Sequence, residues 1–260
     1  MDGGIVSAPV DQLTITALPG MPEVRPGDDL VALLAASIER TGLGLLAGDV
    51  VVVTHKVVSK AEGRLVDLRT VEPSPLAVDW AARYGKDPRQ VEVVLRESVR
   101  IVRMDRGILI SETAHGLICA NAGVDASNVA PDTVCLLPEH PDRSAEAIAA
   151  GLAERFGVPP AVVVTDSFGR PWRNGIVNVA IGIAGLPALT DYRGESDAAG
   201  YALHVSVLAT ADEVAAAAEL VMNKLDAVPA ALLRGYRSPG DHPPGAGRDL
   251  IMDPTKDLFR

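Results

Sequence analysis

Two short runs of apolar residues constrain the fold of this chain more than any other feature. Residues 50–53 are four consecutive valines, and residues 161–164 read AVVV. A strand that is apolar at every position must be buried on both faces, so both runs are predicted to be buried strands. Polar residues follow each run: Thr54 and then HKVVSK come after the first, and TDS comes after the second. Each strand is therefore predicted to lead into a functional site.

The rest of the chain predicts helices and strands interspersed without a regular alternation. Apolar spacing and capping residues predict helices over 30–41, 74–84, 145–156 and 212–225, the last with a capping box of Thr210 and Glu213. Two β-rich runs, VEVVL and VRIVRM, followed by GILI, predict strands in a hairpin or meander within 92–110, and further strands are predicted at 176–183 and 202–208. This order favours an α+β fold, mixed α/β with substantial antiparallel sheet.

A change of composition divides the chain near Arg234. The segment that follows, YRSPGDHPPGAGRD, is rich in proline and glycine and is typical of a linker. We therefore expect a compact unit over 1–234, which two interlocked subdomains could share, and a linker with a C-terminal tail over 235–260.

Charge and cysteine content exclude several classes of protein. The chain carries 34 acidic against 24 basic residues, a net charge of −10, and only 3% aromatic residues, which does not fit a nucleic-acid-binding surface. Two cysteines are too few for a secreted disulfide framework. The N-terminus lacks a basic segment followed by an apolar one, so we expect a cytoplasmic protein without a membrane partner.

The common nucleotide and zinc signatures do not occur in the sequence. There is no GxxxxGK[ST], and the glycine cluster at 42–48 follows a predicted helix and precedes a predicted strand, the reverse of the dinucleotide-binding order. The five histidines are scattered and there is no CxxC pair, which excludes the usual zinc spacings.

Two polar clusters lie in the N-terminal half. Leu18-Pro-Gly-Met21 is a turn whose backbone N–H groups could face a ligand, although an ordinary Pro-Gly turn explains it equally well. His55, Lys56 and Lys60 follow the first valine run, where the lysines could neutralise phosphates or be solvated residues at the end of a strand.

Two further clusters carry carboxylates. Asp125 and Asn128 lie in a predicted loop, where a hard cation and a nucleotide could bind, or where Asp125 could form an Asx turn. Asp166, Ser167 and Arg170 follow the second apolar run and present possible metal and phosphate ligands, with a helix N-cap at Asp166 as the alternative.

Taken in order, these motifs resemble those of the coenzyme F420-0:L-glutamate ligase family, the gamma-glutamyl ligases that extend a deazaflavin coenzyme. The chain is similar to the N-terminal ligase domain of the actinobacterial bifunctional enzymes, whose second, flavin-binding domain is not expected here. The resemblance runs from Leu18 to Arg234 and rests on LPGM, VVSKAEGR, HGLICANAGVD, VVVTDSFGRPWR, DYRG and VMNKLDAVP.

The resemblance implies a GTP-dependent peptide ligase with a family-specific fold, usually an intertwined homodimer. It implies two Mg²⁺ or Mn²⁺ ions held by Asp125, Asp166 and Ser167, a monovalent K⁺, and catalytic roles for Lys60, Asp125, Asp166 and Arg170. The implied nucleotide-binding residues are Leu18, Pro19, Gly20, Met21, His55, Lys60, Asn128, Met222, Asn223 and Lys224. Two positions depart from the family pattern: His55 stands where a serine is usual, and Lys224 or its neighbour where some members have a glutamine ligand.

The implied reaction joins L-glutamate, and then further γ-linked glutamates, to the lactyl carboxylate of F420-0 through an acyl phosphate, and releases GDP and phosphate. His115 is one candidate for removing a proton from the amine. Two alternatives stay open: a catalytically altered GTP-binding relative, and a ligase that joins amino acids to a different acid.

Overall fold

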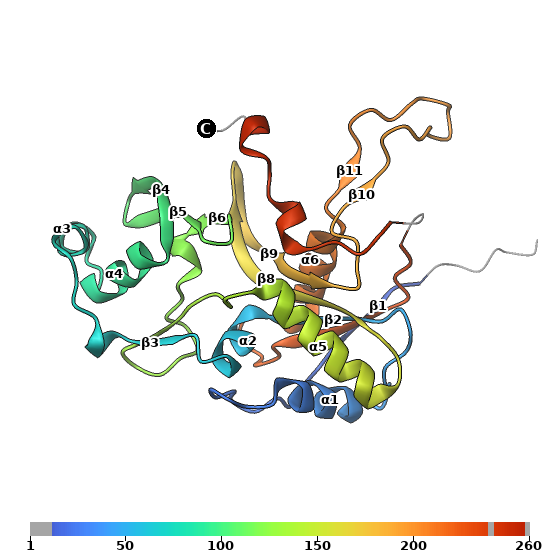
Figure 1. Cartoon of the computed structure of the whole chain (residues 1–260), viewed down its shortest axis with the longest axis horizontal. Helices are drawn as coiled ribbons and strands as arrows, with labels where there is room; N and C mark the ends of the chain where they lie inside the picture. The colour runs from blue at the N-terminus through green and yellow to red at the C-terminus, as the bar shows by residue number, and fades with distance from the viewer. Residues whose placement is uncertain (1–11, 239–241, 258–260) are drawn as a thin grey trace, which may run out of the picture.

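A computed structural model describes residues 12–238 and 242–257 of the chain. Its centre is a five-stranded sheet in the spatial order β1-β12-β2-β8-β9 (Figure 1). The strands are β1 (Thr14–Ala17), β12 (Ala230–Arg234), β2 (Val50–Thr54), β8 (Ala161–Arg170) and β9 (Arg173–Ala184). Only β2 and β8 pair in parallel, and the other neighbours are antiparallel.

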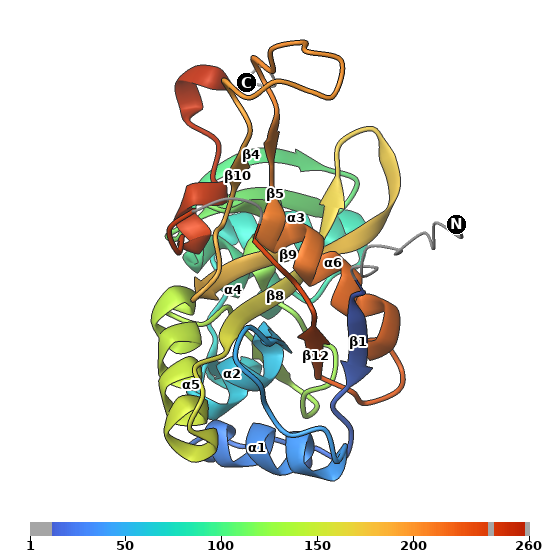
Figure 2. The same cartoon turned by 90° about the vertical axis from the view of Figure 1, so that its right-hand side faces the viewer.

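Helices cover both faces of this sheet, which explains the two apolar runs. The helices α1 (Leu30–Arg40) and α5 (Pro141–Phe156) lie on one face and α6 (Thr210–Met222) on the other (Figure 2). Side chains alternate along β2, so that Val51 and Val53 enter the core beneath α1 and α5 while Val50 and Val52 enter the core beneath α6. All four valines are at most 1% exposed. The two predicted buried strands are confirmed.

A smaller region, residues 65–136, has its own apolar core. It contains the helices α3 (Pro75–Tyr84) and α4 (Pro88–Arg96), and a three-stranded antiparallel sheet of β4 (Ser98–Asp105), β5 (Ile108–Thr113) and β6 (Ile118–Ala120). It also contains the antiparallel pair of β3 (Leu65–Asp67) and β7 (Thr133–Cys135), and two short 3-10 helices, Leu68–Thr70 and Asn121–Gly123. The whole chain is thus mixed α/β with several antiparallel sheets, as predicted.

Two peripheral segments complete the described chain. The strands β10 (Thr190–Asp191) and β11 (Val207–Leu208) pair at the base of an arm that projects from the body (Figure 1). The C-terminal segment that follows β12 contains two 3-10 helices, Gly247–Leu250 and Pro254–Lys256. The first packs against β9, and the N–H of Gly247 donates to Asp142 Oδ1 in the first turn of α5 at 2.7 Å. No helix of the described residues is long and apolar enough to cross a membrane.

Three local predictions are wrong. The run VEVVL was predicted as a strand but lies in α4, where Asp87 caps the helix by accepting from Arg89 N–H and Pro88 occupies the first turn. The strand predicted at 202–208 is reduced to β11. The capping box of Thr210 and Glu213 is absent, because the Thr210 hydroxyl instead lies 2.6 Å from that of Thr190.

Candidate active site between the two regions

The helix α2 (His55–Ala61) begins at the residue after β2, so the HKVVSK cluster is helical. His55 and Ser59 are four residues apart and therefore share one face of this helix. The Nδ1 atom of His55 lies 3.4 Å from the Ser59 hydroxyl. His55, Ser59 and Lys60 are all buried. The sheet thus delivers a buried imidazole and a buried ammonium group to the boundary with the smaller region.

Asp166 meets His55 because β2 and β8 run in parallel and in register. Thr54 of β2 pairs with Thr165 of β8, so the residues that follow them along the chain, His55 and Asp166, lie close together. His55 Nε2 is 3.3 Å from Asp166 Oδ1, and the two side chains are 3% and 18% exposed. The strand β8 continues past Asp166 to Arg170, which contradicts both the predicted strand end and the alternative of a helix N-cap.

Asp125 approaches α2 from the smaller region. Lys56 Nζ donates to Asp125 Oδ2 at 2.7 Å and to the Ser127 hydroxyl at 2.6 Å. Burial raises the pKa of Asp125, but the hydrogen bonds from Lys56 and Ser127 outweigh it and hold the pKa below its ordinary value. Consecutive residues of α2, His55 and Lys56, therefore contact carboxylates from the two different regions.

Two thiols lie beside these carboxylates. Burial and the charge of Asp166 raise the pKa of Cys119 to about 12, and burial also raises the pKa of Cys135. Both cysteines are free and buried. They are held as neutral thiols, which fits a structural role rather than a nucleophilic one.

A second polar network surrounds Ser167, the residue after Asp166. The Ser167 hydroxyl donates to Asn178 Oδ1 at 2.7 Å, and Asn178 Nδ2 donates to Glu219 Oε2 at 2.8 Å. Lys224 Nζ contacts the Ser167 hydroxyl and lies 3.4 Å from Glu219 Oε1. Sequence reasoning missed Asn178 and Glu219, because each lies within an apolar strand or helix with no local motif around it.

Residues 18–21, which were predicted to bind nucleotide, follow β1. Two residues further on, Glu23 forms an ion pair with Lys60 of α2. Leu18 is fully buried in the core, and its N–H donates to the Ala230 carbonyl at 2.9 Å. Pro19 and Gly20 are exposed, while Met21 packs partly against the core. Gly20 has a φ of +77°, and its carbonyl accepts a hydrogen bond from Arg40. At this turn the backbone, rather than side chains, offers the polar groups to a ligand.

Four other predicted site residues are placed less centrally. Asn128 is exposed with a φ of +56°. Arg170 is exposed at the end of the β8–β9 hairpin, where Nη2 donates to the Asn174 carbonyl at 3.2 Å. Met222 is 1% exposed within the core beneath α6. Asn223 Nδ2 donates to Asp226 Oδ2 at 2.9 Å.

The oxygen donors suit a hard divalent cation that a ligand helps to coordinate. Asp125 and Asp166 offer carboxylates and Ser167 a hydroxyl. Among residues 12–238 and 242–257, no three His, Cys, Asp or Glu side chains gather as a metal-binding group. Mg²⁺ is commonly bound by one or two carboxylates together with water and substrate phosphates, so the residues present fit such an ion without forming a complete cage.

Comparison with known proteins identifies relatives of this chain along nearly its whole length. The sequence profile of the family described as F420-0:Gamma-glutamyl ligase matches residues 20–235. A protein named coenzyme F420:L-glutamate ligase from Methanopyrus kandleri is 47% identical over 251 residues, which cover 95% of this chain and 98% of that protein. A protein of the same name from Methanothermobacter thermautotrophicus is 43% identical, and the match covers 95% of this chain and 99% of that protein. Another from Haloarcula marismortui is 42% identical, and the match covers 95% of this chain and 96% of that protein.

Proposed function

The chain belongs to the F420-0:gamma-glutamyl ligase family, and from this premise we propose that it joins L-glutamate to coenzyme F420-0 in a GTP-dependent reaction. The observation that carries the proposal is that Asp166 and Asp125 contact the consecutive residues His55 and Lys56 of α2, the helix that also carries the buried Lys60. Carboxylates and fixed cations at one boundary can bind a triphosphate together with its divalent ions.

The proposed reaction has two steps. A carboxylate oxygen of the F420-0 lactyl group attacks the γ-phosphorus of GTP, the bond to the β,γ-bridging oxygen breaks, and GDP leaves. The amine of glutamate, after losing a proton, attacks the acyl carbon of the resulting acyl phosphate. The C–N bond forms, the C–O bond to the phosphate breaks, and phosphate leaves. The activation is needed because a carboxylate is a poor electrophile.

The side chains of α2 have distinct parts in this proposal. Lys60 is 5% exposed and pairs with Glu23, and an ammonium group released from that pair would attract phosphate oxygens more strongly at this buried position than in water. Asp125, Asp166 and Ser167 would hold Mg²⁺ or Mn²⁺, which supplies charge neutralisation of the triphosphate when bound. Because Lys56 occupies Asp125 Oδ2, cation binding there requires Lys56 to release that oxygen and leaves its ammonium group available to a phosphate.

A mass-spectrometric assay tests the function. Purified protein is incubated with GTP, Mg²⁺ or Mn²⁺, L-glutamate and F420-0, and the coenzyme is analysed for added glutamate. We expect glutamylated product that depends on every component, and replacement of GTP by ATP tests the nucleotide. A folded protein that forms no product under any of these conditions contradicts the proposal.

A second candidate function is favoured by the contact of Lys224 with Ser167. Ser167 is one of the implied metal ligands, so the ammonium group of Lys224 would compete there with a second metal ion. Loss of that ion is expected in a nucleotide-binding relative with altered catalysis. Nucleotide consumption separates the two functions, because a binding protein leaves GTP intact when both co-substrates are present. A Lys224→Gln variant that gains activity favours this second function, and one with unchanged turnover contradicts it.

We also propose that a second copy of the chain covers the projecting hairpins. Ile176 on β9 is 59% exposed, and Tyr201 and Val205 in the arm between β10 and β11 are 66% and 88% exposed. Large apolar side chains that are this exposed on projecting segments are candidates for a protein interface. Light scattering at rising concentration should give a dimer for the native chain and a monomer for a Val205→Asp variant. A native chain that stays monomeric throughout contradicts this proposal.

A further inference from the structure

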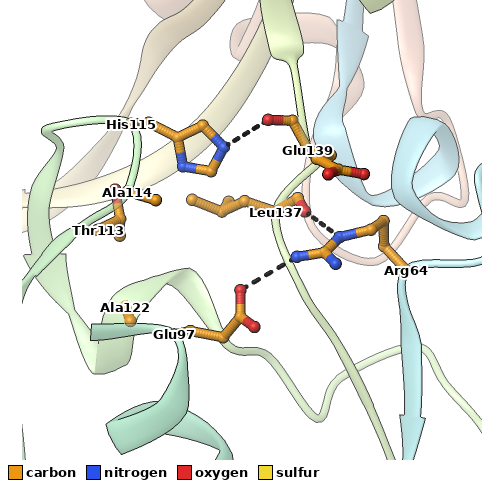
Figure 3. A pocket seen from close by; sticks show the side chains of 8 residues that line it. All are labelled: Arg64, Glu97, Thr113, Ala114, His115, Ala122, Leu137 and Glu139. Atoms are coloured by element: carbon orange, nitrogen blue, oxygen red, sulfur yellow. Dashed lines mark hydrogen bonds and ion pairs between the residues drawn. The ribbon is translucent and has the colours of Figure 1, made fainter. Parts of the chain in front are cut away.

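A cavity of about 210 Å³ lies at the edge of the smaller region, between the turn that joins β5 to β6 and the segment that leads into α5 (Figure 3). Arg64 and His115 in its wall belong to the VVSKAEGR and HGLICANAGVD motifs, but no ligand has been assigned to the cavity above. Its lining residues are Arg64, Glu97, Thr113, Ala114, His115, Ala122, Leu137 and Glu139.

The charges around the cavity favour a ligand that carries both a cation and an anion. Arg64 donates to Glu97 Oε2 at 3.0 Å and to the Leu137 carbonyl at 3.0 Å, which leaves part of its guanidinium free of these bonds. The carboxylates of Glu97 and Glu139 lie on two sides of this guanidinium (Figure 3). One positive and two negative side chains repel a polyanion such as GTP or a phosphorylated coenzyme.

Two polar atoms in the cavity wall have no hydrogen-bond partner within the described structure. They are Oγ1 of Thr113, a residue only 4% exposed, and Nδ1 of His115. His115 Nε2 is 2.9 Å from the Pro138 carbonyl, which can only accept, so Nε2 is the donor; in the tautomer that this bond selects, Nδ1 is an acceptor. Buried polar atoms without partners are costly, and a ligand with N–H groups would satisfy them.

We propose that this cavity binds the amino acid that is ligated. The α-carboxylate of the amino acid pairs with Arg64, and its α-ammonium group lies towards Glu139 and His115. This inference rests on the proposed function. Of the three substrates that this function needs, only the amino acid carries an ammonium group, and the other two carry negative charges alone.

The cavity also lies close to the carboxylates at α2. Ala122 in its wall is three residues before Asp125, and Leu137 is two residues after Cys135, which pairs with Asp125 through two backbone hydrogen bonds. Three residues of chain span at most about 10 Å. An amine bound in the cavity is therefore within a short reach of a carboxyl group activated at the boundary.

Three variants and one matched control test the inference. Arg64→Lys keeps the charge but loses the forked donor, Glu139→Gln removes one carboxylate at an exposed position, and Thr113→Val removes the unpartnered hydroxyl. The control is Glu154→Gln, which neutralises an exposed glutamate near the end of α5. Two readouts are used: the KM for L-glutamate with GTP and F420-0 saturating, and calorimetric titration of L-glutamate into each folded protein.

We expect Arg64→Lys and Glu139→Gln to raise the KM and Kd for L-glutamate by about tenfold, the loss of one charge-assisted hydrogen bond, with the KM for GTP unchanged. The control should behave as the native chain. Native KM and Kd values in folded Glu139→Gln and Thr113→Val proteins overturn the inference, as does a native chain that binds no L-glutamate. If the native chain binds L-glutamate with Arg64 dependence but makes no product, the cavity assignment stands and the proposed function fails.

Discussion

The five-stranded sheet and the smaller region bury their strands in different ways. The valines of β2 are at most 1% exposed because helices cover both faces of the sheet, whereas Val99 and Val102 of β4 are 70% and 40% exposed. The first region places His55 and Asp166 by strand register. The second places Asp125 through a loop that pairs with Cys135. A site at their boundary therefore depends on two different kinds of support, paired strands on one side and a loop on the other.

The largest expected effect concerns the carboxylates, one from each region. Asp125→Asn and Asp166→Asn should each lower ligase turnover by at least about a thousandfold, because each would remove a charge that holds a divalent ion in the proposed function. Product formation by mass spectrometry measures it, and Asp79→Asn on the exposed side of α3 is the control. Full activity in either site variant would show that only one region supplies the site.

The next effect compares an ion pair from each region. Arg234 donates twice to Asp49, whose side chain is 2% exposed, so Arg234→Met leaves a buried charge and should cost about 3–5 kcal/mol in free energy of unfolding. Arg103 pairs with Asp105 at the surface, and Arg103→Ala should change that free energy by less than about 1 kcal/mol. Urea denaturation measures both, and equal losses would break the contrast between the regions.

A smaller effect uses the same substitution in both regions. Ile183 in β9 is 2% exposed, and Ile183→Val should destabilise the protein by about 0.5–1.5 kcal/mol. Ile118 in β6 is 37% exposed, and Ile118→Val should change stability by less than about 0.5 kcal/mol. Chemical denaturation of both variants gives the values. A larger loss at Ile118 would mean that the outer face of the smaller sheet is covered in solution.

The smallest expected effect is the pH dependence of stability that Asp212 of the larger region contributes. Burial raises the pKa of Asp212, against a hydrogen bond from Ala180 N–H to its Oδ1. A carboxyl group with a raised folded-state pKa binds protons more tightly in the native state, so stability falls as the pH rises from about 3.9, its unfolded value, through the folded one.

Asp212→Asn keeps an acceptor for Ala180 and removes this cost. The variant should therefore be slightly more stable than the native chain at pH 7 and show no advantage at about pH 3, where Asp212 is protonated in both states. Thermal denaturation at both pH values measures the difference. An advantage that persists at acid pH would assign the effect to packing rather than to charge.

The sequence predicts β2 and β8 because their signals are local: a short run of β-branched residues that is apolar at every position favours a buried strand. The strands β1 and β12 of the same sheet were not predicted. The same reasoning fails for VEVVL, because burial of Val91 and Val94 against the small core overrides their β propensity. The cap at Asp87 and the proline after it were the signals that identify this helix.

The candidate site was predicted only in part for a related reason. Asp125 and Asp166 stand out beside their motifs, but the partners of each depend on contacts across many residues of sequence. Lys56 lies 69 residues from Asp125, and Glu219 lies 41 residues from Asn178. No local pattern reports such contacts. The cavity at Arg64 likewise forms from segments that only the fold brings together.

The direct junction of β2 with α2 makes the chain intolerant of insertion at this point. Each residue of an α-helix turns the chain by about 100°. One residue added between Val53 and His55 would therefore rotate His55 away from Asp166 and Lys56 away from Asp125 together. Homologous chains that vary in length should place their insertions and deletions elsewhere, and a length change here should mark a chain that has lost its site.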